Sequence, residues 1–402
     1  MRRHPTRRRP ARGRAAAFLA LCALCAGLLT ACASGNGPGS NSNSETSAGL
    51  ISVSDSACGG RWQLARPGWH TFEIRNAGTA GAEIDLINPV SGAEYAEIEN
   101  SGPGTTTPMS LDVGSGTYAF LCEFSDFSPL TGPTVTVTGH IKGAPAVLPI
   151  TFDELVPVAK KFQGETGAAL AVLARETGTL TAAIRAGHLA AAKGDWLTAH
   201  VQYETLGAAY GAFGNFDTEI NGRADAVGVN SPQWTGFYRL EYGLWHGQSA
   251  ADLAPVAATL DNDVKALVAW WPSQQISLID LGRRTHEVLE NALQFQLTGH
   301  DDYGSGTTLA TTVANISATR VLLALLHPLL AARYPGLTAV STGLNQLQAL
   351  LEKEHRPNGW WVPVSGLSAS ARQQIDAAAG QVLQELAPIA SIAEPRNTNR
   401  AF

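Results

Sequence analysis

The sequence lacks the short motifs by which many hydrolases and nucleotide-binding enzymes are detected. It contains no His-Glu-x-x-His, which would place two zinc ligands and a general base on one helix, and no Gly-x-Ser-x-Gly nucleophile elbow. It also has no glycine-rich loop of the type that cradles phosphate groups. These absences argue against a catalyst, and we expect a binding protein rather than an enzyme.

Charge is scarce and unevenly placed. No acidic residue precedes Glu45, although seven arginines lie among the first 14 positions. Charged residues make up only 15% of the chain and hydrophobic residues 45%, which is enough for a sizeable core. Without residues 1–31 the chain has 21 basic and 34 acidic residues, a formal charge of −13. Such an acidic protein is not expected to bind nucleic acid, and its field is compatible with attracting cations.

The N-terminal segment has the pattern of a bacterial lipoprotein signal. The arginine-rich residues 2–14 precede the apolar stretch 15–29, which is short for a membrane-spanning helix. The Leu-Thr-Ala-Cys sequence that ends at Cys32 resembles a lipobox. We therefore expect residues 1–31 to be removed, Cys32 to carry a lipid, and residues 32–50 to form a flexible tether. The protein would be exported and lipid-anchored on the outer side of the cytoplasmic membrane; an ordinary signal peptide is the alternative.

Residues 51–141 have the pattern of a small all-β domain. Short runs of β-prone residues alternate with Gly, Pro and Asn turns, which predicts a Greek-key sandwich. Examples of these runs are 71–74, 83–87, 117–121 and 134–138. A proline-containing linker at 142–150 follows.

Cys58 and Cys122 are the only cysteines after Cys32. In an exported protein an even pair most simply forms a disulfide. A blue-copper site also needs two His and usually a Met. The loop that follows Cys122 has neither residue, so we do not expect electron-transfer copper.

Residues 151–393 have the composition of an all-α domain. Stretches rich in Ala and Leu favour helices, and their order predicts packed antiparallel helices in a bundle. Asp195 and Ser368 are expected at helix N-caps, and residues 394–402 are expected to form a frayed tail. The predicted helices lie near 152–175, 176–191, 194–213, 234–245, 250–270, 274–296, 308–333, 337–356 and 369–393.

The stretch 233–247 is the most informative part of the helical region. It reads as an amphipathic helix on which Tyr238 and Glu241, three residues apart, share one face. A buried carboxylate beside aromatic rings is usually paired or metal-bound. Gly236, Phe237 and Glu241 match the Gly-Phe-His-x-x-Glu signature of the EfeO/imelysin-like family, with Tyr238 at the His position.

The resemblance covers most of the helical region. Tyr203 and Glu204 match a Tyr-Glu-x-x-Glu motif of the family, in which Gly207 here replaces the second acid. The resemblance implies a cupredoxin-like β-sandwich followed by an imelysin-type helix bundle. It also implies a periplasmic iron-uptake protein that binds ferric or ferrous iron and works with an iron permease and its partner proteins.

We expect one metal site in the helical region, formed by His200, Glu204, Tyr238 and Glu241. His200 precedes Glu204 by four residues, so both share a helix face, and a phenolate oxygen suits ferric iron. The acidic loop 300–302 is a weaker candidate for contacting a cation. In the alternative, His200 faces solvent, Tyr238 is core, and the acids form ordinary pairs. The protein would then be a degenerate family member that binds an anionic polysaccharide, haem or a protein partner.

The resemblance also opens an alternative for the cysteine pair. Glu83 matches a Glu of the family's β domain. The thiolates of Cys58 and Cys122 would join Glu83 in a second metal site, with copper as the candidate metal. The same sulfurs cannot serve both this site and a disulfide.

Overall fold

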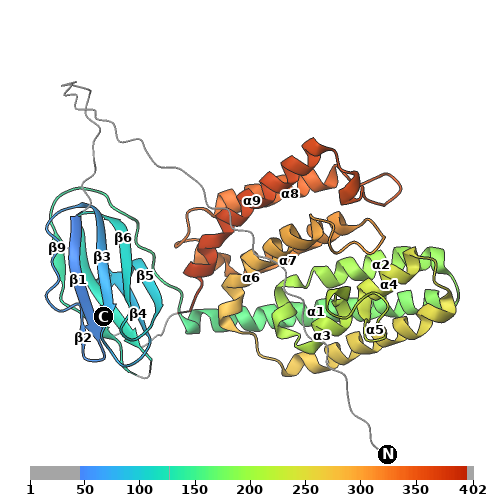
Figure 1. Ribbon diagram of the computed structural model, residues 1–402, viewed down its shortest axis with the longest axis horizontal. Helices are drawn as coiled ribbons and strands as arrows, with labels where there is room; N and C mark the ends of the chain where they lie inside the picture. Colours follow the sequence, from blue (N-terminus) through green and yellow to red (C-terminus); the bar gives the residue numbers. More distant parts are fainter. Residues whose placement is uncertain (1–45, 126, 396–402) are drawn as a thin grey trace, which may run out of the picture. The chain divides into compact units, whose positions relative to one another are not determined.

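The computed structural model describes residues 46–125 and 127–395 (Figure 1). The strands come first in the chain and the helices follow, so the predicted order of a β region before a helical region is confirmed. The predicted signal segment 1–31, the lipidation residue Cys32 and the last part of the tail, 396–402, lie outside the described residues.

The β region consists of two sheets around one hydrophobic core. The first sheet has the order β2-β1-β3-β6; the second has the order β5-β4-β7-β8, with β9 paired to β7. Because side chains alternate across a strand, Phe72 of the first sheet meets Phe120 of the second, with ring centroids 5.9 Å apart. The strands are β1 (Thr46–Ser54), β2 (Ala57–Cys58), β3 (Gly68–Asn76), β4 (Ala82–Ile87), β5 (Glu94–Ser101), β6 (Thr106–Val113), β7 (Gly116–Phe124), β8 (Leu130–Thr131) and β9 (Val135–Val137).

The flexible tether predicted for 32–50 ends earlier than expected. Strand β1 begins at Thr46, which pairs with His70 on β3, and after an irregularity Leu50 pairs with Glu73. A strand is held by backbone hydrogen bonds that its side chains do not reveal. The Ser- and Gly-rich composition of 46–50 therefore led to the prediction of a tether where β1 begins.

A disulfide joins Cys58 on β2 to Cys122 on β7, with a Cα–Cα distance of 5.8 Å, and so links the two sheets. The alternative metal site of Cys58, Glu83 and Cys122 does not hold, because both sulfurs are used. Strand alternation also opposes it: Cys122 pairs with Ile84 across β4 and β7, so Glu83 points to the other face of the sheet. The candidate copper ion of the β region loses its thiolate ligands by the same argument.

Glu83 lies instead beside Asp85 and Glu97, on the sheet face opposite the core. One ligand oxygen from each acid lies within 4.8 Å of the other two. Each of the three already takes part in an interaction within the protein. We therefore assign no ligand to this group.

Helix α1 runs unbroken over Phe152–Arg185, where the composition predicts two helices, 152–175 and 176–191. It begins in a capping box: the Thr151 hydroxyl accepts from the Glu154 amide, and the Glu154 carboxylate accepts from the Thr151 amide. No residue between the two predicted helices forces a break, because proline is absent there. Composition alone could not distinguish one long helix from two.

Of the two N-caps predicted from the sequence, Asp195 is wrong and Ser368 is confirmed. Gly187, with φ +77°, separates α1 from α2 (Leu189–Glu204), which begins before the predicted start at 194. Asp195 therefore lies inside α2 and is not an N-cap. The Ser368 hydroxyl does accept from the Ala371 amide at 3.1 Å, and this N-cap is confirmed.

The helix predicted over 194–213 is divided, because α2 ends at Glu204 and the 3-10 turn η1 (Gly207–Ala212) follows it. The short helix α3 (Asn215–Asn221) was not predicted. Helices this short depend on tertiary packing more than on propensity. The remaining elements are η2 (Ala224–Ala226), α4 (Gly236–Trp245), α5 (Ala250–Trp270), η3 (Trp271–Ser273), α6 (Leu278–Asn291), the π-helical turn η4 (Ala292–Gln296), α7 (Thr308–Leu330), α8 (Leu337–Glu352), η5 (Val364–Gly366) and α9 (Ala369–Ile392).

Helix α7 lies against α1, α2, α6 and α8. By length and composition it is the one helix in the described ranges that could cross a membrane. However, 67% of its most apolar window is buried inside the protein. A helix that is apolar on all sides and packed by four neighbours is explained as the core of the bundle.

Candidate metal site

The four predicted site residues lie in one buried neighbourhood. The end of α2 carries His200 and Glu204, and the first turns of α4 carry Tyr238 and Glu241. Each of the four residues is only 1–2% exposed. The alternative that His200 faces solvent is therefore wrong, although burial alone does not bring the four side chains to one point.

Gly236 explains how α4 can start next to α3. Its φ is +84°, and a Cβ at this position would lie 2.2 Å from the carbonyl oxygen of Ile220. Only glycine can adopt this positive φ and lie this close to the Ile220 carbonyl without strain. The glycine of the signature thus places Tyr238 and Glu241 beside the end of α2.

Glu204 is held on both carboxylate oxygens. Its Oε1 accepts from Asn221 Nδ2 at 2.9 Å and lies 3.2 Å from His200 Nε2. When the Asn315 amide is oriented so that both its atoms have partners, its nitrogen donates to Glu204 Oε2 at 3.2 Å. His200 Nε2 also contacts Asn221 Oδ1 at 3.1 Å. His200 therefore orients the Glu204 carboxylate.

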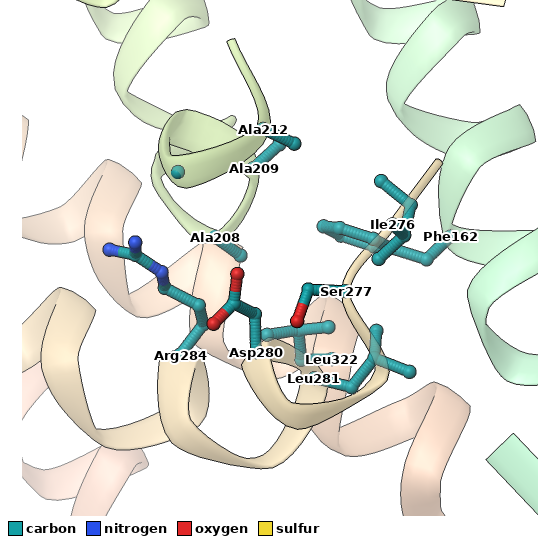
Figure 2. Close-up of a pocket in the computed structure, with 11 residues that line it drawn as sticks. Phe162, Ala208, Ala209, Ala212, Ile276, Ser277, Asp280, Leu281, Arg284 and Leu322 are labelled. Atoms are coloured by element: carbon teal, nitrogen blue, oxygen red, sulfur yellow. The ribbon is translucent and has the colours of Figure 1, made fainter. Parts of the chain in front are cut away.

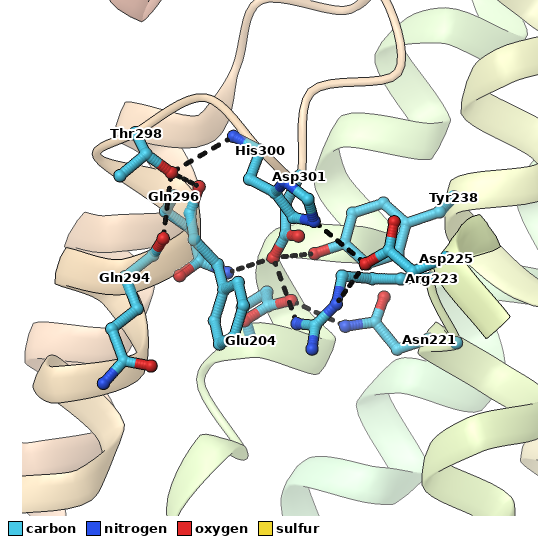
Figure 3. A network of polar contacts seen from close by, with 12 residues as sticks. Glu204, Asn221, Arg223, Asp225, Tyr238, Gln294, Gln296, Thr298, His300 and Asp301 are labelled. Carbon is cyan, nitrogen blue, oxygen red and sulfur yellow. Dashed lines mark hydrogen bonds and ion pairs between the residues drawn. The ribbon is translucent and has the colours of Figure 1, made fainter. Parts of the chain in front are cut away.

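Tyr238 points toward Asp301, as Figure 3 shows, and its hydroxyl donates to Asp301 Oδ2 at 3.3 Å. The same oxygen accepts from Gln296 Nε2 at 2.9 Å and lies 3.7 Å from Arg223 Nη1. Asp301 is 3% exposed, and its Oδ1 is buried with no hydrogen-bond partner among the described residues. Burial raises the pKa of the Asp301 carboxyl to about 6.

Glu241 faces away from this cluster, toward the loop that precedes α7. Its Oε1 accepts from the backbone N–H groups of Tyr303 at 3.1 Å and Ser305 at 2.9 Å. Burial raises the pKa of the Glu241 carboxyl to about 7, against the lowering effect of the Ser305 hydrogen bonds. Through these two hydrogen bonds, Glu241 holds the loop that carries Asp301 in place.

A polar cavity of about 210 Å³ lies at the centre of this arrangement. Of the four predicted residues, Glu204 and Tyr238 line it, and His200 and Glu241 do not. Its lining consists of Glu204, Gly207, Tyr210, Asp217, Asn221, Arg223, Tyr238, Val288, Asn291, Phe295, Gln296, Asp301 and Asn315. The structure thus divides the predicted four-residue site and adds Asp217 and Asp301 to the wall.

The two added acids carried weak signals in the sequence. Asp301 belongs to the acidic loop 300–302, whose composition equally suits a plain turn. Asp217 lies in α3, a helix that composition did not predict, and it accepts from the Tyr203 hydroxyl at 2.7 Å. Burial raises the pKa of the Asp217 carboxyl. A turn and a short unpredicted helix could be recognised as part of the site only once they were folded against α2 and α4.

The cavity can receive a cation through hard oxygen donors. Carboxylates and a phenol meet there, and such ligands favour iron in its higher oxidation state. Burial and the nearby acids Glu204 and Asp301 raise the pKa of the Tyr238 hydroxyl well above its usual value. A bound cation would reverse this effect, because ligands must lose their protons to bind.

A second, much smaller cavity lies between η1 and α6 (Figure 2). Its volume is about 10 Å³, roughly the space of one water molecule. Arg284 reaches over Gly211 here: a Cβ on Gly211 would lie 2.3 Å from Arg284 Nη2. This cavity is a packing feature around an arginine and is too small for a ligand.

Comparison with known proteins gives one family and several relatives. The model of the imelysin family matches residues 167–389. The chain is 26% identical over 313 residues to the iron uptake system component EfeO of Yersinia pestis, covering 77% of this chain and 82% of the relative. It is 24% identical over 322 residues to EfeO of Escherichia coli strain K12, with the same coverage. EfeO of Yersinia pseudotuberculosis is 25% identical over 313 residues.

Proposed function

The chain belongs to the imelysin family, and from this premise we propose that it is an extracytoplasmic iron-binding component of an iron uptake system. The relatives named as iron uptake components match most of its length. The observation that carries the proposal is the polar cavity that Glu204, Tyr238 and Asp301 line together. An iron-binding protein without a catalytic role is consistent with this site.

Each residue has a defined part in the proposed site. Glu204, Tyr238 and Asp301 supply oxygen ligands. His200 positions Glu204 through its Nε2, and Glu241 positions Asp301 by holding the 303–305 backbone. Tyr238 stands at the position of the family's histidine, so this chain would bind iron more through oxygen and less through nitrogen.

Calorimetry of the purified protein tests this function. We expect one iron per chain, supplied either as Fe2+ under argon or as the ferric nitrilotriacetate complex. The affinity should rise between about pH 5 and 7 as the Asp301 carboxyl, with a pKa of about 6, loses its proton. Binding should also release protons, which makes the heat depend on the buffer. If neither form of iron binds, the site has lost its metal function and the family fold here serves another ligand.

We also propose that the protein is exported and anchored by a lipid on Cys32, near an iron permease and its partner proteins. The lipobox-like sequence and the Ser- and Gly-rich segment after it support this placement. The Cys32→Ala variant should move from the membrane fraction to the soluble exported fraction of cells. Firm membrane association of that variant would contradict the lipid anchor.

The β region fits the cupredoxin-like domain that the family resemblance implies. Two sheets with a shared core and the parallel pairing of β1 with β3 support that assignment. In our proposal this domain holds no metal through sulfur, because its two cysteines form the disulfide.

A further inference from the structure

Among the described residues that line the acidic cavity, Arg223 is the one that carries a guanidinium. Its Nη1 lies 3.7 Å from Asp301 Oδ2, and its Nε lies 3.6 Å from Asp225 Oδ2. Figure 3 shows it between these two acids. Its Cζ lies 3.8 Å from the centre of the Phe295 ring, a cation–π contact that keeps the side chain in place.

The guanidinium N–H groups of Arg223 form two long ion pairs but are not saturated by the described residues. Both ion-pair distances exceed hydrogen-bond length, and no hydrogen bond joins its guanidinium to any residue in the described ranges. By contrast, Arg333 donates to Glu154 at 2.9 Å and to the Leu148 carbonyl at 2.8 Å. The Arg223 side chain is 36% exposed, so a ligand that enters the cavity can reach it.

A permanent positive charge conflicts with binding a bare metal cation in the same cavity. Arginine does not lose its proton in proteins, so it repels the metal at every usable pH. The three proposed side-chain ligands, Glu204, Tyr238 and Asp301, leave coordination positions of iron open. In the part of the chain that the structure describes, His200, Glu204 and Glu241 do not bring their ligand atoms within 4.8 Å of one another.

We propose that the cavity binds iron together with a small oxyanion, which lies between Arg223 and the metal. This rests on the proposed iron-binding function. The planar fork of a guanidinium matches two oxygens of such an anion. The remaining oxygen fills a coordination position, and the negative charge separates the two cations. The bound ligand is therefore iron together with an anion of the size of bicarbonate or phosphate, which completes the coordination of the metal.

The test is calorimetry of iron binding to the purified protein in carbonate-free, phosphate-free buffer, followed by addition of bicarbonate or phosphate. Fe2+ under argon and ferric nitrilotriacetate are used in parallel. We expect at least one of the two anions to tighten iron binding about tenfold or more, because the Arg223 guanidinium then donates two charge-assisted hydrogen bonds to the anion. Native mass spectrometry should then show protein, iron and anion in one complex.

Arg223→Gln should lose this gain, and Arg223→Lys should recover only part of it because lysine has no fork. Arg320→Gln is the matched control: it removes the same charge from α7, where Arg320 bonds Asn345, and should keep the full anion effect. Thermal melts should show all three variants folded.

Three results would contradict the proposal, and each has its own meaning. If neither anion changes the iron affinity of the wild type or of Arg223→Gln, the proposed iron binding still holds but the proposed anion does not bind with the metal. Tighter binding by Arg223→Gln in every buffer would show that Arg223 only competes with the metal. Absence of iron binding to the wild type in all buffers would instead overturn the proposed function itself.

Discussion

Glu204→Gln is expected to lower iron affinity about 100-fold, because it removes one charged ligand from a buried site in which a few ligands share the binding energy. Glu204 is 2% exposed, and its oxygens are placed by His200, Asn221 and Asn315 before any cation arrives. Glutamine has the same shape, so the packing around α2 is kept. Only the charge and one acceptor oxygen are changed.

The measurement is calorimetry with iron in the same buffer for each variant. Glu352→Gln is the matched control, because Glu352 is an exposed residue at the end of α8 that accepts from Gln348 on its own helix. It should bind like the wild type. Equal loss in both variants would indicate a general charge effect. No loss in Glu204→Gln would place the metal elsewhere.

Tyr238→Phe is expected to abolish the phenolate-to-iron charge-transfer absorption of the ferric protein. The Tyr238 hydroxyl lies in the cavity wall and donates to Asp301, and the residue is 2% exposed. Phenylalanine keeps the ring against His200 and Tyr303, whose centroids lie 5.2 Å and 5.3 Å away. The fold should therefore remain while the coloured ligand is lost.

Absorption spectra of the ferric protein at matched iron occupancy check this prediction. Tyr242→Phe is the control: Tyr242 lies on the same helix, outside the cavity, and packs on Trp234 and His246. That variant should keep the band. A band that survives in Tyr238→Phe and vanishes in a variant of another cavity tyrosine, such as Tyr210, would show that the wrong phenol was assigned.

The sequence determined the features that depend on local chemistry or on one motif. Composition separated a β region from a helical region, and capping chemistry identified Ser368 as the start of α9. The Gly-Phe-x-x-x-Glu motif identified the family and directed attention to α4. Glu204 and Tyr238 were found because each stands at a position of a family motif, and helical spacing then placed His200 and Glu241 near them.

Only the tertiary structure decided which polar atoms meet. Helical spacing placed His200 beside Glu204 and Tyr238 beside Glu241, but it could not show that Glu241 turns to the 303–305 backbone. Asp301 enters the site from a loop 63 residues beyond Tyr238. Likewise, the separation of Glu83 from Cys122 follows from the register of β4 with β7. These contacts join distant segments, and their geometry is set by packing across the whole domain, which no local pattern encodes.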